Sequence, residues 1–362
     1  MKRERGLMPL RKINYQGFRN LVDAELEFDD DFNFIIGRNG AGKTNLLEAI
    51  FYVGLASSFR VKEEKSLIRS EDQFLRVNAE TNGKKAIIYL DNNNKKLMLQ
   101  GNEVYRLNDF IGWLGMTILS IEDIWIIRGS PAKRRTFLNW VIAKSSPIYL
   151  ANLIEYRKIL RQRNKTLQLA NENGDMSLLE IFDEQLIKVG NEIYKEREIN
   201  LPELKKNIAA TGADFGLQKL NFDYQCTCPN MRLNHNTLKK VRQREMIFGH
   251  TIVGPHRDDL LFSINGYPLR QFASEGEERA AAISLKLAEA EMLYNKTGKR
   301  PILLLDEVSA ELDQTKKEIL LSLLKGQVFY ASIQLPKFAQ MQQKGYNLFS
   351  IERGIIEVSK KN

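Results

Sequence analysis

The stretch that decides the fold is Gly37-Arg38-Asn39-Gly40-Ala41-Gly42-Lys43-Thr44. The apolar run Phe34-Ile35-Ile36 precedes it and an amphipathic segment follows it, so the order is strand, glycine-rich turn and helix. Glycines let the backbone wrap around a phosphate chain and aim N–H groups at it, and a helix start adds its positive dipole end. A chance glycine-rich turn is the alternative, but this context favours a phosphate-binding loop.

Two side chains at the end of this phosphate loop (residues 37–44) have expected roles of their own. Lys43 supplies a mobile cation for the β- and γ-phosphates, and the hydroxyl of Thr44 is the expected Mg²⁺ ligand. Downstream, Arg60 ends the polar stretch Ser57-Ser58-Phe59-Arg60 and could also reach the nucleotide. The sequence therefore predicts a nucleotide site in which Lys43 serves both binding and catalysis.

Composition and charge narrow the class of protein. The 362 residues correspond to about two domains, and no run of about 18 apolar residues predicts a membrane span. The two cysteines, Cys226 and Cys228, are too few for a disulfide framework or a zinc site, so we expect reduced thiols and a cytoplasmic protein. The net charge of +9 favours nucleic acid as a partner over a membrane surface.

The order of predicted elements separates a strand-rich part from a helical part. Residues 74–104 alternate strand-like runs with Asn- and Gly-rich turns, which predicts an antiparallel meander. Helical periodicity dominates from 130 to about 206, where predicted helices 150–169 and 178–201 flank a polar loop at 171–175 and form an antiparallel arm. The basic residues of the first arm helix predict either a solvated face or a DNA-contacting face. They are Arg157, Lys158, Arg161, Arg163 and Lys165.

A pair of acids completes the predicted chemistry. The apolar run 301–305 is typical of a central strand, and it ends in Asp306 and Glu307. Carboxylates at that position are costly unless they serve a cation or a polarised water. We therefore expect Asp306 to hold Mg²⁺ with Thr44, and Glu307 to activate the attacking water. A strand that merely ends in solvent is the alternative, and the phosphate loop argues against it.

A second donor set lies at Ser274-Glu275-Gly276-Glu277-Glu278-Arg279, before an alanine-rich helix over 280–291. Ser274, Gly276 and the helix start form donors suited to a phosphate. Within one chain they would duplicate the phosphate loop. The economical arrangement therefore places Ser274 of one subunit against the γ-phosphate held by another copy. A simple polar helix cap is the alternative.

These stretches together resemble the motif set of ABC-type ATPases, with Walker A at 37–44, the signature at 274–279, Walker B at 306–307 and the D-loop at 309–313. Within that class the chain resembles the RecF family of bacterial DNA replication and repair proteins. Further stretches carry this resemblance. They are Tyr15–Asn20, Ser57–Arg60, Glu122-Asp123 with Gly129–Leu138, and Gly254–Leu260 with Phe272–Ser274.

The resemblance implies an α/β fold, namely an ABC-type, SMC-like ATPase head with a mixed sheet and an antiparallel β meander, plus a helical arm. It places the ATPase lobe at 1–115 and 295–362, and the arm lobe with the signature at 116–294. The implied cofactors are ATP and Mg²⁺. The implied additional nucleotide contacts are Arg19, Asn20, Gly276 and Arg279. RecF-like proteins form ATP-dependent homodimers, hydrolyse ATP slowly, bind DNA at single-strand gaps or ss/ds junctions, and help RecA loading with RecO and RecR.

Three acids stand where the family usually has glutamines. They are Glu275, Glu277 and Glu278, and they should repel a γ-phosphate unless they point away or meet Lys or Arg. Two other functions are open. One is an SMC-like ATPase of a defence or chromosome-organising system, which needs a long coiled coil or a nuclease partner. The other is a binding scaffold in which the nucleotide is only structural, against which Glu307 argues.

Overall fold

The computed structural model describes residues 8–173, 177–341 and 345–361, and the chain divides into two compact units. Unit 1 comprises Met1–Asp123 with Leu285–Asn362, and unit 2 comprises Ile124–Ser284. Unit 1 extends past the boundary expected at residue 115, because strand β8 (Met116–Ser120) pairs in parallel with strand β12 (Ile302–Asp306) of the same unit. The second boundary falls between Ser284 and Leu285, earlier in helix α9 (Glu275–Thr297) than the expected boundary at 294/295, so this helix contributes to both units.

One sheet of unit 1 is mixed and includes the strand that leads into the phosphate loop. Its order is β15 (Ile355–Lys361), β14 (Tyr346–Glu352), β3 (Phe32–Ile36), β13 (Val328–Ser332), β12 and β8. The neighbours from β14 to β8 are parallel, and β15 is antiparallel to β14. The register aligns Ser332 with Ile36 and Asp306 with Ala331. Parallel strands end at one edge of a sheet, so the phosphate loop and the acidic pair, Asp306 and Glu307, meet there.

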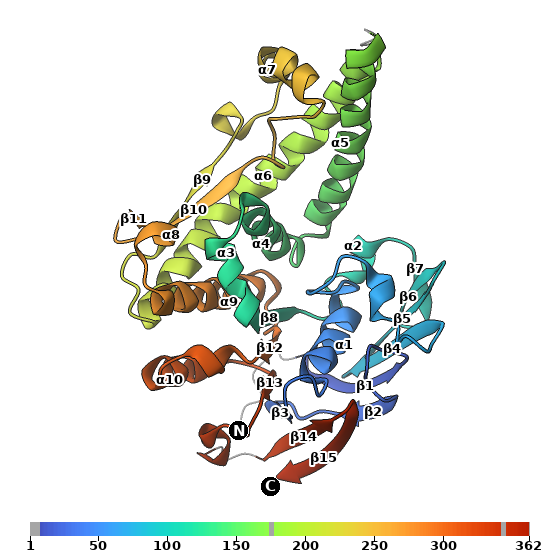
Figure 1. Ribbon diagram of the computed structural model, residues 1–362, viewed down its shortest axis with the longest axis vertical. Coiled ribbons are helices and arrows are strands. Elements are labelled where there is room, and N and C mark those ends of the chain that lie inside the picture. The colour runs from blue at the N-terminus through green and yellow to red at the C-terminus, as the bar shows by residue number, and fades with distance from the viewer. Residues whose placement is uncertain (1–7, 174–176, 342–344, 362) are drawn as a thin grey trace. The chain divides into compact units, whose positions relative to one another are not determined.

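The other sheet of unit 1 is the predicted antiparallel meander. It runs β2 (Ala24–Glu27), β1 (Leu10–Gln16), β4 (Phe74–Thr81), β5 (Lys84–Asp91), β6 (Lys95–Leu99) and β7 (Asn102–Val104). Helix α1 (Lys43–Leu55) packs between the two sheets, against β12 and β13 on one side and β4 and β5 on the other (Figure 1). This position explains why nearly every side chain of α1 is buried.

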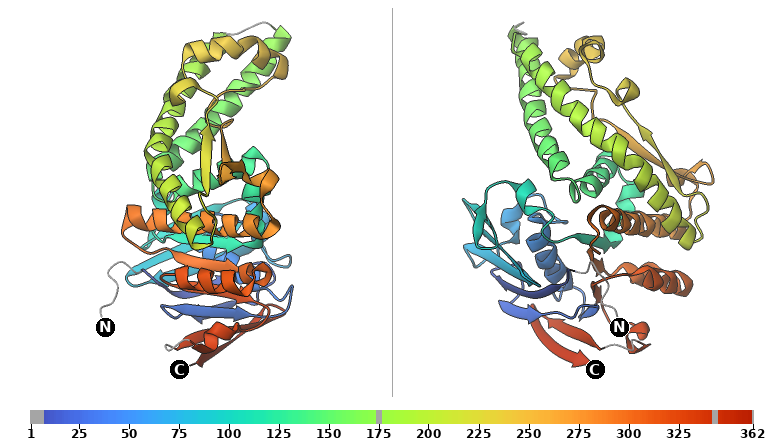
Figure 2. Two further views of the ribbon diagram at one scale, coloured as in Figure 1. Left: turned by 90° about the vertical axis from the view of Figure 1, so that its left-hand side faces the viewer. Right: turned by 180° about the vertical axis from the view of Figure 1, so that it is seen from behind.

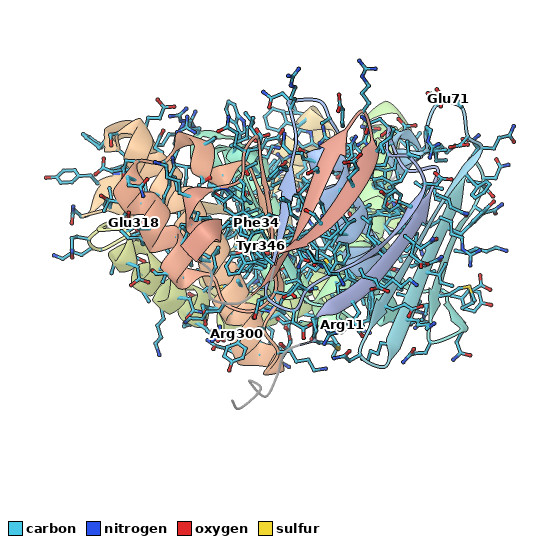
Figure 3. All side chains as sticks on the ribbon, turned by 90° about the horizontal axis from the view of Figure 1, so that it is seen from below. Arg11, Phe34, Glu71, Arg300, Glu318 and Tyr346 are labelled. Carbon is cyan, nitrogen blue, oxygen red and sulfur yellow. The ribbon has the colours of Figure 1, made fainter. Side chains whose placement is uncertain are left out.

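Aromatic side chains hold strand β3 in place. The ring of Phe34 is fully buried, and its centroid lies 5.0 Å from that of Tyr346 (Figure 3) and 5.5 Å from that of Phe338. Burying a side chain of this size contributes about 2 kcal/mol, so the strand that enters the phosphate loop is firmly anchored. The smaller elements of unit 1 are α2 (Leu107–Phe110), α10 (Gln314–Leu323), and the 3₁₀ helices η1 (Glu64–Leu67), η2 (Ile121–Asp123), η4 (Val308–Glu311) and η5 (Lys337–Met341).

Two long antiparallel helices dominate unit 2, as the periodicity predicts. They are α5 (Pro147–Asn173) and α6 (Ser177–Asp214), which pack against each other (Figure 2). Residues 171–173 of the expected loop belong instead to α5, which continues to Asn173, and residues 174–176 lie outside the described part. The remaining elements are α3 (Ile124–Arg128), α4 (Pro131–Ala143), β9 (Asn221–Gln225), η3 (Pro229–Met231), α7 (His235–Phe248), β10 (Asp259–Ile264), β11 (Tyr267–Pro268), α8 (Leu269–Phe272) and the start of α9.

Helix α6 is longer than its sequence suggests. It does not end at Leu201 but runs through Pro202 to Asp214. Leu204 and Ile208 continue its buried face, and this packing outweighs the hydrogen bond that proline removes. No helix within the described residues is long and apolar enough to cross a membrane.

One member of the basic set on α5 belongs to the interior. Arg163 is fully buried and donates hydrogen bonds to Asp183, Thr251 and Glu245. It lies four residues from both Ile159 and Leu167, which are buried as well, and residues at this spacing share one face of a helix. The prediction that Arg163 is part of an exposed basic face is therefore wrong. The other members of the set are exposed, and they are Arg157, Lys158, Arg161 and Lys165.

Candidate nucleotide-binding site

The phosphate loop turns from β3 into α1 with a backbone that glycine adopts most easily. Gly40 and Gly42 have φ angles of +77° and +121°, in a region that other residues rarely occupy. At Gly37, a Cβ atom would lie 2.4 Å from the carbonyl oxygen of Ile351. Gly42 is the N-cap of α1, and no side chain caps this helix. The N–H groups of its first turn are therefore donors of the kind that a phosphate requires.

Lys43 joins the phosphate loop to the acidic pair. Its ammonium nitrogen donates to the carbonyl oxygens of Gly37 at 2.8 Å and Arg38 at 3.1 Å, and it lies 2.9 Å from Oε1 of Glu307. These three acceptors match the three N–H donors of an ammonium group. The Lys43 side chain is 3% exposed and that of Glu307 is 27% exposed, so Glu307 is the partner with room to turn away when Lys43 meets a phosphate.

The backbone of Glu307 is strained. Its φ and ψ angles are 56° and 15°, in the left-handed region, and its N–H donates to the carbonyl oxygen of Ala331 at 3.1 Å. A residue with a Cβ atom loses on the order of 1 kcal/mol in this conformation. The sharp turn at the end of β12 leaves the Glu307 carboxylate beside Lys43. Strain of this kind is typical of residues that are placed for chemistry.

The two residues expected to hold Mg²⁺ are in direct contact. Thr44 Oγ1 donates to Asp306 Oδ1 at 3.0 Å. Burial raises the pKa of Asp306 to about 6, the hydrogen bond from Thr44 opposes this rise, and the charge of Glu307 adds to it. A hydroxyl and a carboxylate at one point suit a hard cation such as Mg²⁺, whose charge would favour ionised Asp306. The residues present therefore fit the ion. The described part of the chain holds no cluster of three or more His, Cys, Asp or Glu residues suited to a metal.

Arg19 and Arg60 converge on α1 through Glu48, a carboxylate that the sequence motifs do not reveal. Glu48 is fully buried and lies 3.0 Å from Nε of Arg19 and 3.5 Å from Nη1 of Arg60. Asn20 joins the same group, because Asn45 Nδ2 donates to its Oδ1 at 2.6 Å. The structure thus gathers three of the expected contacts around the start of α1. Their contact with a nucleotide stays a prediction.

The turn between β14 and β15 braces the phosphate loop, and no sequence motif predicts this role. Gly354 donates its N–H to the carbonyl oxygen of Ala41 and accepts at its own carbonyl from the N–H of Val22, both at 2.9 Å. Gly354 has a φ angle of +81°, and a Cβ atom there would lie 2.0 Å from the carbonyl oxygen of Asn20. The available signal is a glycine in a turn, and it does not say which loop the turn supports.

The signature segment (Ser274–Arg279) lies in unit 2, at the start of α9. The N–H and the hydroxyl of Ser274 both donate to Oε2 of Glu277, at 2.8 Å and 2.7 Å, in the manner of a capping box. Gly276 is the second residue of the helix. Arg279 donates from Nη2 to Oε1 of Glu275 at 2.7 Å. Ser274, Gly276 and Arg279 therefore share one helical turn, in which Ser274 is exposed and the other two are partly buried, and this turn is separate in sequence from the phosphate loop.

The acids of the signature segment have partners in unit 2. Glu275 pairs with Arg279 and lies 3.8 Å from Arg128, and Glu278 lies 2.5 Å from Arg128. Glu277 accepts the hydrogen bonds of Ser274. Glu275 and Glu278 thus meet arginines, which is the condition under which their repulsion of a phosphate is reduced.

Comparison with known proteins places the chain in a family. The RecF/RecN/SMC N terminal domain model matches residues 9–357. A DNA replication and repair protein RecF from Oceanobacillus iheyensis is 33% identical, over 96% of this chain and 100% of its own length. The chain belongs to the RecF family. The RecF protein of Bacillus cytotoxicus is 34% identical, over 89% of this chain and 90% of its own length.

Solved structures give the same result for the fold. A structure of the recombination mediator protein RecF with ATPrS has a TM-score of 0.90 and 33% identity, and the match covers 99% of this chain and 100% of that one. The Smc head domain of Pyrococcus furiosus, at 17% identity, has a TM-score of 0.56 over 98% of this chain and 96% of that one. The α/β ABC-type ATPase fold with an added arm, as expected from the sequence, is thereby confirmed for this RecF-family chain.

Proposed function

We propose that this chain is a slow ATPase in which ATP controls dimerisation and DNA binding in recombinational repair and replication restart. The dimer would bind DNA at single-strand gaps or ss/ds junctions and help RecA loading with RecO and RecR. The observation that carries the proposal is the joined site of unit 1, where Lys43 meets Glu307 and Thr44 meets Asp306. The RecF family, whose relatives are named for DNA replication and repair, supports the biological role.

Each group of the site has a task that its position supports. The loop N–H groups and Lys43 bind and orient the phosphates. Thr44 and Asp306 hold Mg²⁺, which when bound supplies positive charge to the phosphate oxygens. Glu307 orients a water and takes its proton. Lys43 and Glu307 must part before either can do this, because they hold each other at 2.9 Å. Hydrolysis that waits for such a rearrangement suits a slow ATPase.

The signature segment supports a dimer in which the two copies share the nucleotides. Unit 1 already supplies a helix start and a lysine to the phosphates, and two acids to the metal and the water. Ser274, Gly276 and Arg279 add a second donor set on a helical turn in which Ser274 is exposed. We assign this set to the nucleotide held by the other copy. Glu277 must then release the Ser274 N–H and hydroxyl, because both now donate to it.

The surface charge supports DNA as the ligand of the dimer. The chain carries a net charge of +9, and basic residues of α5 are exposed, among them Arg157, Lys158 and Arg161. Contacts of this kind are made with the phosphate backbone, so affinity should fall steeply as salt rises. Dimerisation would place two such surfaces on one DNA and make binding depend on ATP.

Sedimentation velocity with gapped duplex DNA tests the proposal. The wild type should be monomeric with ADP, and with ATP it should form a dimer that binds the DNA. Lys43→Arg keeps the positive charge, but a planar guanidinium cannot meet the three acceptors that surround the Lys43 ammonium group. This variant should lose ATP-dependent DNA binding. Equal DNA affinity with and without ATP would overturn the idea of an ATP-controlled clamp.

A second variant separates a catalytic nucleotide from a structural one. Glu307→Gln should bind ATP, fail to hydrolyse it and remain dimeric, because the amide cannot take a proton from water. Glu318→Gln is a matched control, since Glu318 is an exposed residue of α10 that accepts from Gln314 Nε2 at 2.8 Å. Wild-type hydrolysis by Glu307→Gln would remove Glu307 from the catalytic role.

The arm argues against the alternative of an SMC-like chromosome-organising or defence ATPase. Helices α5 and α6 contain 27 and 38 residues. At about 1.5 Å per residue they form a short hairpin and not a long coiled coil that could link distant DNA segments. A hairpin of this length suits a protein that binds one DNA site and does not bridge distant ones.

A further inference from the structure

Glu48 lies one helical turn after Thr44 on α1, and its side chain has no solvent exposure. A buried carboxylate is strongly unfavourable unless charged or polar donors surround it. From Leu46 onward the other residues of α1 are apolar or aromatic, as suits a helix that packs between two sheets. An acid at this position therefore needs an explanation that core packing does not supply.

The donors to Glu48 come from two separate segments. Arg19, in the turn after β1, donates from Nε to Oε2 at 3.0 Å and from Nη2 to Oε1 at 3.1 Å. Ser58, in the connection after α1, donates its hydroxyl to Oε1. Arg60 lies in the same connection, with Nη1 at 3.5 Å from Oε2. One carboxylate thus ties both segments to the helix that begins at the phosphate loop.

Ser58 links Glu48 to the backbone of the segment that contains Arg60. Its Oγ accepts hydrogen bonds from the N–H of Arg60 at 2.9 Å and of Val61 at 3.0 Å while its hydroxyl hydrogen is directed to Glu48. Serine hydroxyls that bond nearby backbone groups in this way hold a turn in one conformation. Glu48 therefore orients the main chain of Arg60 as well as its side chain.

The guanidinium of Arg60 is held over the first turn of α1. Its Nη1 donates to Asn45 Oδ1 at 2.8 Å, and Asn45 directly follows Thr44. Its side chain is 38% exposed, against 19% for Arg19. The charge of Arg60 also helps to lower the pKa of Asp306, against the larger effect of burial. Arg60 thus lies at the start of α1, near the residues expected to hold the metal, and its side chain is partly exposed to solvent.

We propose that Glu48 is a positioning residue of the ATP site: it holds the Arg60 segment so that the Arg60 guanidinium pairs with a phosphate of the nucleotide. The inference rests on the proposed ATP-binding function. Glu48 does not touch the nucleotide itself. Without its negative charge, Arg19 and Arg60 repel each other, Ser58 loses its acceptor, and the loop that presents Arg60 loosens.

A double-mutant cycle on ATP affinity tests this role, because it measures whether two residues act together. The full chain is used as wild type, Glu48→Gln, Arg60→Ala and the double variant, with Kd for Mg²⁺-ATP from calorimetry. Glu48→Gln should raise the Kd about tenfold, and the same substitution should have almost no further effect in the Arg60→Ala background. Glu64→Gln is the matched control, since Glu64 pairs with Lys95 and Tyr52 elsewhere in unit 1 and should leave the Kd unchanged.

A purely structural Glu48 gives a different pattern. Glu48→Gln would then lower the melting temperature while the folded protein keeps the wild-type Kd, or it would shift the Kd equally in both backgrounds. Either result overturns the inference. If Glu48→Gln does not fold, Ser58→Ala takes its place in the cycle, with the same expected non-additivity with Arg60→Ala. Failure of the wild type to bind ATP would instead contradict the proposed function, so the two failures are distinguishable.

Discussion

Both units bury a carboxylate that binds arginine, yet the two clusters differ in how completely they are closed. In unit 1, Glu48 is buried but its partner Arg60 is 38% exposed. In unit 2, Asp258 and its partner Arg197 are 0% and 1% exposed. The first cluster leaves the arginine charge partly exposed, where we propose that it meets a ligand, and the second keeps both charges in the interior. Both clusters contain a buried ion pair, so they differ in the solvent exposure of the arginine. An exposed arginine is available to a ligand, whereas a buried one serves packing.

The closed cluster is satisfied on all sides. Asp258 accepts from Nη1 of Arg197 at 3.1 Å, from the N–H and hydroxyl of Thr227 at 2.8 Å and 2.9 Å, and from the hydroxyls of Tyr194 and Tyr224. Asp258 belongs to the Gly254–Leu260 stretch, which carries much of the resemblance to the RecF family. This part of the family pattern therefore reflects the internal packing of unit 2.

The largest predicted effect comes from breaking the closed cluster. Asp258→Asn leaves the Arg197 charge buried without its partner, so unit 2 should lose about 3–5 kcal/mol of stability. Hydrogen exchange should show the loss in peptides of unit 2, with the ATP Kd of the folded protein unchanged. Asp223→Asn is the control, because its side chain is 80% exposed and lies 3.9 Å from Lys205. A large change in ATP Kd for Asp258→Asn would erase the distinction between the clusters.

A smaller effect should appear on acidification. His256 is held neutral in unit 2, where the Tyr156 hydroxyl lies 2.9 Å from Nδ1 and the Thr251 carbonyl oxygen lies 3.1 Å from Nε2. Burial lowers the pKa of His256 to about 3, and nearby arginines add to this. Between pH 6.5 and 3 the unfolded chain binds a proton that the folded chain does not. The free energy of unfolding should therefore decrease as the pH is lowered, by up to about 1.4 kcal/mol per pH unit.

Urea unfolding at pH 7, 6 and 5 measures this slope. His256→Gln should flatten it, and the exposed His235 provides the control, since His235→Gln should leave it as in the wild type. An identical slope in His256→Gln would show that the closed region of unit 2 does not sense pH through this side chain.

The smallest predicted effect concerns the signature segment, in which Glu277 is partly exposed. Glu277→Gln keeps an oxygen that can accept from Ser274 but removes a charge that repels the phosphate of the other copy. ATP-dependent dimerisation should tighten about two- to fivefold, as expected for a charge that solvent partly screens. Sedimentation equilibrium with ATP measures this, with the exposed Glu318 as control: Glu318→Gln removes the same charge from α10. Equal tightening in both variants would assign the effect to net charge alone.

Residues 37–44 and the acidic pair could be placed from the sequence, because each motif is contiguous and its geometry is local. A glycine-rich turn after a strand can only begin a helix in a few ways, and an apolar strand that ends in acids must place them at the edge of its sheet. The helical arm followed from periodicity in the same way. Its details did not: Arg163 was predicted to be surface charge, since a basic run does not tell which member turns inward.

The sequence by itself thus determined the phosphate loop, the acids that face it, the two-unit organisation and the RecF family. Only the tertiary structure shows that Glu48 pairs with Arg19 and Arg60. It also shows that Gly354 supports the phosphate loop through Ala41, and that Asp258 pairs with Arg197 in the interior of unit 2. The physical reason is distance along the chain. A local motif states its own geometry, whereas a buried carboxylate acquires its role from donors that only folding brings to it.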